Sequence, residues 1–166
     1  MSVSILAAYA SRSGSTQEVA ETIAATLEAD GLTVVCEPVS KVRTLEGYSA
    51  VVLGAPLYMF RWHKDAKQFL SRHRDALLRR PVAVFALGPF HADEKEFQAA
   101  RGQLDKELLQ FPWFAPVAIE IFGGKFNPTQ LRFPLNLIPA LRKMPPSDIR
   151  DWAAIRTWAS GLADQL

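Results

Sequence analysis

The most informative stretch near the N-terminus is Ser4-Ile5-Leu6-Ala7-Ala8-Tyr9-Ala10-Ser11-Arg12-Ser13-Gly14-Ser15-Thr16. Residues 4–9 form a short apolar run, which is typical of a strand that is covered on both faces. Residues 11–16 are polar with one glycine, and residues 15–29 carry apolar side chains four positions apart. That spacing predicts a helix. The stretch therefore predicts a buried strand, a short polar turn and a helix.

The alternation of strands and helices continues along the chain. Strands are expected at residues 32–39, 50–53, 82–87 and 116–122, and helices at residues 63–78, 94–109 and 149–162. Strands separated by helices form parallel βαβ units with right-handed crossovers. The sequence thus predicts an α/β fold with a doubly wound five-stranded parallel sheet, strand order 2-1-3-4-5, and helices on both faces.

Length and composition indicate one soluble domain, residues 1–166. Of the 166 residues, 49% are apolar and 22% charged. The chain lacks the run of about 18 apolar residues that a membrane-spanning helix needs. The N-terminus has no basic leader, and the single Cys36 excludes an internal disulfide, so a cytoplasmic location is expected. Cys36 lies in an apolar run and is predicted to be a buried, unreactive thiol.

One segment departs from the pattern. The insert, about residues 123–147, follows the last predicted strand and contains five prolines. Because proline breaks helices, we expect a long loop with at most short helical turns. From Ile121 to Ser147 there is no Asp or Glu, and four cations surround an apolar middle: Lys125, Arg132, Arg142 and Lys143.

The polar turn at residues 11–16 has the properties of a phosphate-binding loop. It lies at the carboxyl end of the first predicted strand, where open α/β sheets bind ligands. A helix start offers free backbone amides and the positive end of the helix dipole. Gly14 permits close approach of the backbone, and Ser15 with Glu18 fits a capping box. Further donors are the hydroxyls of Ser11, Ser13, Ser15 and Thr16. The alternative is an ordinary polar turn with a good helix cap.

Other site chemistries are not indicated by the sequence. A P-loop needs Gly-Lys-Ser/Thr and a dinucleotide fingerprint needs three spaced glycines, but this turn contains only Gly14. His63, His73 and His91 show no metal-ligand spacing with Cys36. A hydrolase elbow and a nucleic-acid-binding motif are both missing, so no nucleic-acid partner is expected.

The turn resembles the FMN-phosphate loop of flavodoxins, Thr/Ser-x-Thr/Ser-Gly-x-Thr, with Ser11, Ser13, Gly14 and Thr16 at the pattern positions. The resemblance extends over essentially the whole chain. The segments Gly54-Ala55-Pro56-Leu57-Tyr58 and Gly88-Pro89-Phe90-His91 are similar to the second and third flavin loops of that family. The resemblance implies a flavodoxin-like fold with bound FMN. The implied binding residues are Ser11, Arg12, Ser13, Gly14, Ser15 and Thr16 for the phosphate, and Pro56, Leu57, Tyr58, Met59, Phe60, Gly88, Pro89, Phe90 and His91 for the ring.

Aromatic residues in the second and third loops suit a flat, apolar flavin ring. We expect Tyr58 or Phe60 against one face of the ring and Phe90 near the other. Trp62 is interpreted either as a ring neighbour or as a core residue. His91 is interpreted either as a proton donor or as a surface histidine.

Two features differ from flavodoxin electron carriers. Those carriers are strongly acidic as a rule, whereas this chain has a net charge of +2. The carriers also often have a glycine in the second loop, whose peptide flips and stabilises the flavin semiquinone. Residues 55–62 contain no glycine, so such a flip would cost more. Both features favour an enzyme that passes electron pairs.

Within the flavodoxin superfamily the chain is most similar to the short, quinone-dependent protoporphyrinogen IX dehydrogenases. The similarity covers the phosphate loop, Val52–Ala55 through Trp62-His63, the insert, and Asp151-Trp152. It implies a role in porphyrin biosynthesis, in which a reduced porphyrinogen passes electrons through FMN to a quinone. No catalytic side chain is predicted, because the flavin carries the chemistry.

The insert has three interpretations. Its apolar middle and basic ends suit a dicarboxylate porphyrinogen, or peripheral contact of residues 125–143 with an anionic membrane at its inner face. It could equally cover the sheet edge. For the whole protein the alternatives are a flavodoxin-type electron carrier and an NAD(P)H:quinone reductase, and the oligomeric state is left open.

Overall fold

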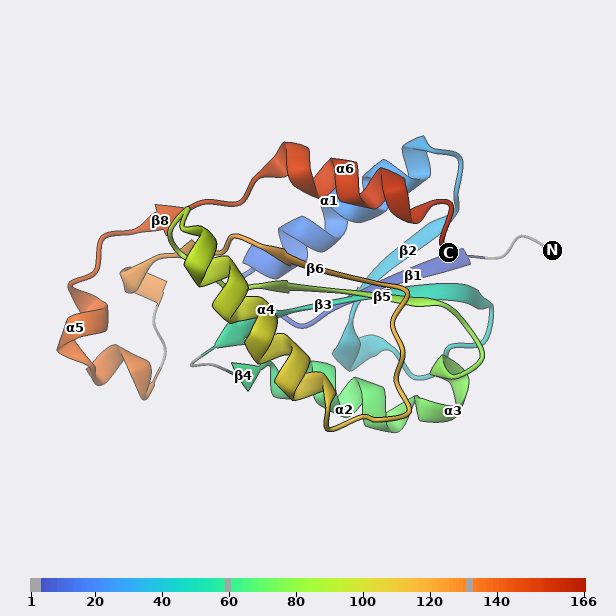
Figure 1. Ribbon diagram of the computed structural model, residues 1–166, viewed down its shortest axis with the longest axis horizontal. Coiled ribbons are helices and arrows are strands. Elements are labelled where there is room, and N and C mark those ends of the chain that lie inside the picture. Colours follow the sequence, from blue (N-terminus) through green and yellow to red (C-terminus); the bar gives the residue numbers. More distant parts are fainter. Residues whose placement is uncertain (1–3, 59–60, 131–132) are drawn as a thin grey trace.

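The computed structural model describes residues 4–58, 61–130 and 133–166 of the chain (Figure 1). Its first elements are β1 (Ser4–Tyr9) and α1 (Ser15–Ala29), which have the bounds that the sequence predicts. Gly31 follows the helix with a φ of 95°, a conformation that suits glycine at a helix C-terminus. Residues 10–14 lie between the two elements, so Ser15 and Thr16 of the predicted polar turn belong to the helix.

The described residues form a sheet of five parallel strands with a short sixth strand beside it. The order is β2-β1-β3-β5-β6, and β4 pairs with β3. Among the parallel strands this is the predicted order 2-1-3-4-5, so the doubly wound fold is confirmed. The strands other than β1 are β2 (Val34–Pro38), β3 (Tyr48–Tyr58), β4 (Arg61–Trp62), β5 (Val82–Leu87) and β6 (Ala118–Phe122).

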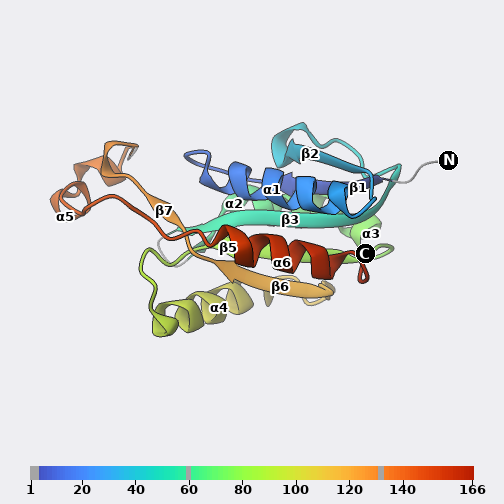
Figure 2. The same ribbon diagram turned by 90° about the horizontal axis from the view of Figure 1, so that it is seen from above.

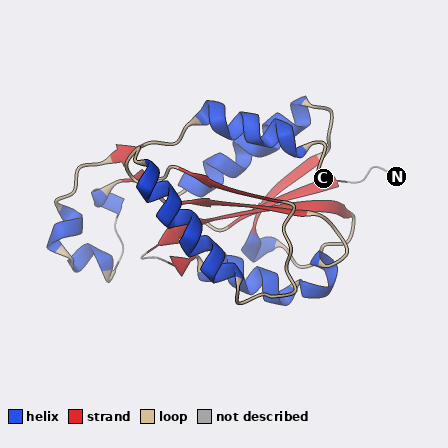
Figure 3. Cartoon of the chain, viewed as in Figure 1, coloured by secondary structure: helices blue, strands red, loops and turns tan. Residues whose placement is uncertain are grey.

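Helices cover both faces of the sheet (Figures 1 and 3). On one face lie α1 and α6 (Trp152–Leu162); on the other lie α2 (Lys64–Arg72), α3 (Arg74–Leu77) and α4 (Glu94–Leu108). Successive residues of a strand point to opposite faces. Ile5 accordingly packs in the core under α1 and α6, and Leu6 in the core under α2 and α4. Two buried faces explain why the central strands are apolar throughout.

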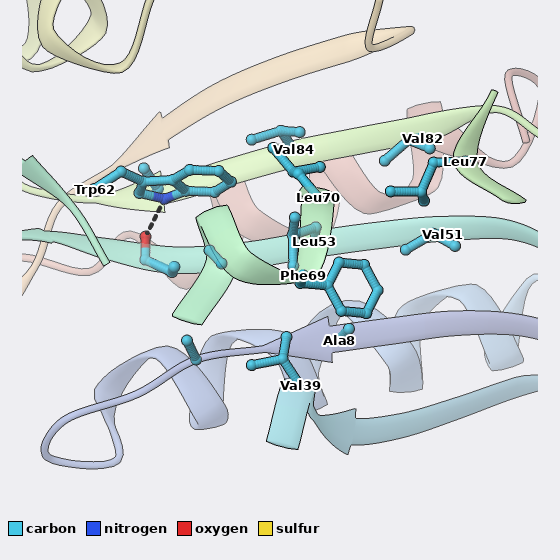
Figure 4. Close-up of a cluster of buried hydrophobic side chains, with 14 of the residues drawn as sticks. Ala8, Val39, Val51, Leu53, Trp62, Phe69, Leu70, Leu77, Val82 and Val84 are labelled. Carbon is cyan, nitrogen blue, oxygen red and sulfur yellow. Dashed lines mark hydrogen bonds between the residues drawn. The ribbon is translucent and has the colours of Figure 1, made fainter. Parts of the chain in front are cut away.

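Trp62 belongs to the second of these cores (Figure 4). Its side chain is 1% exposed, and its indole Nε1 donates a hydrogen bond of 3.1 Å to the carbonyl oxygen of Ala55. Buried indole nitrogens usually find such a partner. Of the two interpretations of Trp62, the core residue is therefore the correct one.

The second predicted loop begins later than expected. β3 does not end at Leu53 but continues to Tyr58, where Leu57 pairs with Trp62 in an antiparallel hairpin with β4. Residues 54–56 pair with β5, and the hairpin pairs the last two residues of the strand. Gly54 lies inside the strand. A side chain is not tolerated there, because a Cβ would come within 1.9 Å of the Phe85 ring. The glycine thus serves close packing and does not mark the end of the strand.

The second strand and the second helix also differ from the prediction. β2 is shorter than residues 32–39 because a 3₁₀ turn, η1 (Val39–Lys41), follows Pro38. The helix expected at residues 63–78 is divided at His73 into α2 and α3. The inward residues Phe69 and Leu77 remain buried on both sides of the break, so their spacing in the sequence does not reveal it.

The insert leaves the sheet at its carboxyl end and extends away from the body of the domain (Figure 2). Its short elements are β7 (Lys125–Phe126), η2 (Pro128–Gln130), η3 (Leu135–Leu137), α5 (Pro139–Arg142) and β8 (Ser147–Asp148). The predicted short helical turns are confirmed. The antiparallel pairing of β7 with β8, which closes the base of the insert, was not predicted. No helix among the described residues is long and apolar enough to cross a bilayer.

Candidate functional site

The phosphate loop, residues 11–16, is shaped by one glycine and one serine. Gly14 is the N-cap of α1 with a φ of 91°, and its backbone amide donates a 2.9 Å hydrogen bond to Ser11 Oγ. The predicted capping box is wrong: Ser15 is already inside the helix, and in the described part of the chain no side chain caps this end. The Glu18 carboxylate instead contacts Arg150. The first-turn amides of α1 therefore remain available to a ligand.

Thr16 shows whether the loop fits a phosphate. Its side chain is fully buried, and Oγ1 has no hydrogen-bond partner among the described residues. A buried hydroxyl without a partner costs free energy, and such groups in folded proteins call for an explanation. A phosphate at the N-terminus of α1 would accept this hydrogen bond together with those of the free amides. The loop thus fits the phosphate of FMN.

The three predicted loops meet at one small cavity. The residues that line it come from the phosphate loop, the end of β3, the segment after β5 and the base of the insert. They are Arg12, Ser13, Ser15, Pro56, Leu57, Tyr58, Leu87, Gly88, Phe90, Gly124 and Lys125. The carboxyl ends of neighbouring parallel strands lie at the same edge of the sheet, which explains how segments distant in the sequence converge here.

Aromatic and cationic groups surround this cavity. The guanidinium of Arg12 lies 4.4 Å from the centre of the Tyr58 ring, a cation–π contact. Phe90 packs against Phe126 of the insert, with ring centres 5.3 Å apart. The amide of Gly124 donates a 2.7 Å hydrogen bond to the Pro89 carbonyl, which ties the insert to the third loop. The cavity therefore offers a flat ligand apolar walls with positive charge nearby.

A second, larger cavity of about 650 Å³ borders the other side of the phosphate loop. It extends from Tyr9–Gly14 to Ser40 and Asp65 near η1 and α2. His63 caps α2 there: its Nδ1 accepts a 3.1 Å hydrogen bond from the Asp65 amide. Burial lowers the pKa of His63, although the Asp65 carboxylate partly opposes this shift. The neutral imidazole is therefore favoured, as its capping role requires.

Some predicted binding residues lie elsewhere or cannot be placed. His91 does not line either cavity; its ring Nδ1 lies 2.9 Å from Glu96 Oε1, and its side chain is mostly exposed. Pro89 is buried and contributes its carbonyl to Gly124. Met59 and Phe60 lie outside the described residues. The binding roles of these residues stay predictions.

Sequence reasoning missed the base of the insert. Gly124 and Lys125 line the small cavity, and the sequence signal for them was a glycine pair directly after the last strand. Cys36 is half-buried and not buried as predicted, but partial burial still raises the pKa of its thiol to about 11. The thiol stays protonated near neutral pH and is a poor nucleophile.

A doubly wound sheet with a phosphate loop after its first strand defines the class of nucleotide-binding α/β domains. The model of the flavodoxin domain family matches residues 6–138, which is most of the chain. This chain belongs to the flavodoxin domain family. FMN is the cofactor of that family, in agreement with the predicted cofactor. Comparison with curated protein sequences found no match.

Solved flavodoxin structures confirm the fold. The chain is similar to flavodoxin 2 from Bacillus cereus, with 21% identity, a TM-score of 0.60, and coverage of 99% of this chain and 100% of that one. The Streptococcus pneumonia TIGR4 flavodoxin has 15% identity, a TM-score of 0.60, and coverage of 99% and 100%. Rubredoxin oxygen:oxidoreductase from Desulfovibrio gigas has 14% identity and a TM-score of 0.57, and the match covers 98% of this chain and 35% of that one. These comparisons do not support the narrower resemblance to protoporphyrinogen IX dehydrogenases.

Proposed function

We propose that this protein binds FMN and transfers electrons through it as a flavodoxin-type redox protein. Residues 11–16 hold the phosphate, and the flavin ring lies over the mouth of the small cavity between Tyr58 and Phe90, whose volume of about 40 Å³ is too small to enclose it. The bound flavin supplies the redox chemistry. The chain itself supplies donors to the phosphate, apolar walls for the ring, and the charge that surrounds both.

The buried hydroxyl of Thr16 is the observation that carries this proposal. It lies in the same helix turn as the free amides, next to a cavity that the three predicted loops share. An ordinary polar turn, the alternative interpretation, would leave this hydroxyl in water or give it a protein acceptor. A bound phosphate accounts for the glycine, the open helix end and the unpaired hydroxyl together.

Positive charge at the cavity indicates what an electron-transfer partner would look like. Arg12 and Lys125 line the cavity, and the chain carries a net charge of +2. Electrostatic complementarity steers association. A protein partner of this domain is therefore proposed to present an acidic surface, the reverse of the arrangement in acidic flavodoxins.

The experiment is an anaerobic FMN titration of the apoprotein followed by a redox titration of the holoprotein. The expected result is one FMN bound per chain, with the flavin absorbance bleaching reversibly on reduction. Protein that remains colourless and takes up no FMN would refute the proposal. Reduction in two separated one-electron steps supports the carrier, whereas a single two-electron step supports an enzyme.

The insert favours a second candidate, an oxidoreductase of the protoporphyrinogen dehydrogenase type. Phe133, Leu137 and Ile138 are exposed, and Lys125, Arg142 and Lys143 lie in the same acid-free segment. Exposed apolar side chains beside cations suit an apolar ring with carboxylates, or an anionic membrane where a quinone would be reached. Arg132, another cation of this segment, lies outside the described residues.

The substrate of this second candidate can be tested directly. Protoporphyrinogen added anaerobically to the holoprotein should bleach the flavin, and a quinone should restore its colour. Rapid bleaching by NAD(P)H would point to a quinone reductase. If neither donor reduces the flavin while an artificial reductant does, the enzyme candidate is refuted and the carrier remains.

A further inference from the structure

Arg150 is a buried cation at the junction of the insert and the phosphate-loop helix. Its side chain is 4% exposed. Two of its nitrogens, Nε and Nη2, donate to the two carboxylate oxygens of Asp148 at 2.9 and 2.8 Å. Nη1 donates to the Ser15 carbonyl oxygen and to Glu18 Oε1, both at 3.3 Å. One guanidinium therefore connects β8, where the insert returns, with the first turn of α1.

These contacts are more than a surface ion pair. The pairing with Asp148 is bidentate, the geometry in which arginine binds carboxylates most specifically. The guanidinium also lies 4.7 Å from the centre of the Trp152 ring, which holds it from the side of α6. Because the side chain is buried, moving the base of the insert or the first turn of α1 would break charged hydrogen bonds.

We propose that Arg150 couples the insert to the phosphate loop, as a positioning residue that prepares the first turn of α1 for the FMN phosphate. This inference rests on the proposed function. Arg150 holds the turn through the Ser15 carbonyl and joins it to Asp148 of β8. FMN bound at the turn then restrains the insert, and an ordered insert tightens FMN binding to the same extent, because coupling between two sites is reciprocal.

Arg150 also prepares the first turn of α1 for phosphate through its charge. Glu18 lies in the first turn of α1, so its carboxylate and a bound phosphate carry like charges at the same helix end. Arg150 neutralises that carboxylate through its 3.3 Å contact. Without Arg150 the carboxylate would oppose the phosphate. Replacement of Glu18 by glutamine should then recover part of the affinity that is lost with Arg150.

The test measures FMN affinity of the apoprotein by flavin fluorescence and tryptic cleavage of the insert at Arg142 and Lys143. Arg150→Gln should weaken FMN binding about tenfold, which corresponds to about 1.4 kcal/mol. The double variant with Glu18→Gln should recover about threefold of that loss, or about 0.7 kcal/mol. FMN should slow cleavage of the insert in the wild-type protein but not in Arg150→Gln. Arg101→Gln, which breaks an exposed ion pair with Asp105, is the matched control and should behave as wild type.

Asp148→Asn keeps Arg150 beside Glu18 and weakens only the connection to β8. This variant tests the coupling if Arg150→Gln folds poorly. It should abolish the FMN-dependent protection of the insert while reducing FMN affinity less. Wild-type protein that binds no FMN refutes the proposed function and this inference with it. Wild-type binding with an unchanged affinity in Arg150→Gln refutes the coupling alone. Persistent protection in both variants, or no recovery in the double variant, also contradicts it.

Discussion

Replacement of Thr16 by valine should have opposite effects on the apoprotein and on FMN binding. Valine has nearly the shape of threonine and a similar helix propensity, so the change removes little besides the hydroxyl. In the protein without ligand that hydroxyl is buried and has no partner among the described residues. In the complex we expect it to donate to the FMN phosphate.

General hydrogen-bond energies, applied to the buried Thr16 hydroxyl, give the size of both effects. Burying an unpaired hydroxyl costs about 1–3 kcal/mol, so the Thr16→Val apoprotein should be more stable by roughly 1 kcal/mol or more. A hydrogen bond to a charged acceptor contributes about 1.5–3 kcal/mol. FMN affinity should therefore fall by roughly ten- to a hundredfold. A purely structural hydroxyl would not produce these opposite signs.

Two measurements on one preparation check this prediction: urea unfolding of the apoprotein and fluorescence titration with FMN. Thr26→Val is the control on the same helix, because the Thr26 hydroxyl already donates 2.8 Å to the Thr22 carbonyl. The control should leave FMN affinity unchanged. If Thr16→Val binds FMN as tightly as wild type, Thr16 does not contact the phosphate and the placement of FMN is wrong.

Four other substitutions follow from the structure. Gly14→Ala should destabilise the protein by about 1–2 kcal/mol, because the backbone at Gly14 has a positive φ. Gly102→Ala, inside α4, should instead stabilise the protein by about 0.5–1 kcal/mol. Equal effects of the two substitutions in urea unfolding would contradict this prediction. Trp62→Phe should cost about 1–3 kcal/mol, because the Ala55 carbonyl loses its buried donor. Burial lowers the pKa of His73 below 6.5. As the pH falls, the imidazole of His73 is therefore protonated in the unfolded state before it is protonated in the folded state. The stability of the fold should then decrease as the pH drops through about 6.5. His73→Phe should flatten that dependence in denaturation series between about pH 5 and pH 8.

The strands and helices that were predicted correctly depend on residues that are neighbours in the sequence. β1 and β5 are continuous apolar runs, and α1 has apolar residues four apart, ended by Asp30-Gly31. The turn between β1 and α1 was also predicted from local residues, because a glycine among hydroxyl-bearing residues favours a turn and a helix start. Its binding of phosphate stays a prediction. The capping box failed because Gly14, which takes a positive φ, displaced Ser15 as the N-cap.

The second loop and the role of Trp62 could not be predicted in this way. Gly54 and Pro56 are usual signs of a turn, yet β3 continues through both because they pair with β5, and β4 then folds back and pairs with the end of the strand. Trp62 follows a predicted binding loop, but it turns into the core and donates to the Ala55 carbonyl. Pairing and burial of this kind depend on neighbours that the spacing of residues does not specify.

The succession of strands and helices along the chain, the polar turn after β1 and the acid-free insert follow from local residue patterns, because helix periodicity, turn chemistry and charge act over a few neighbouring positions. The shared cavity of Tyr58, Phe90 and Lys125 arose only when parallel strands brought their carboxyl ends to one edge. The contact of Arg150 with Ser15 and Glu18 likewise joins residues more than 130 positions apart. Such contacts exist because α6 packs beside α1 and brings the segment before α6 to the start of α1, and no local pattern encodes that pairing.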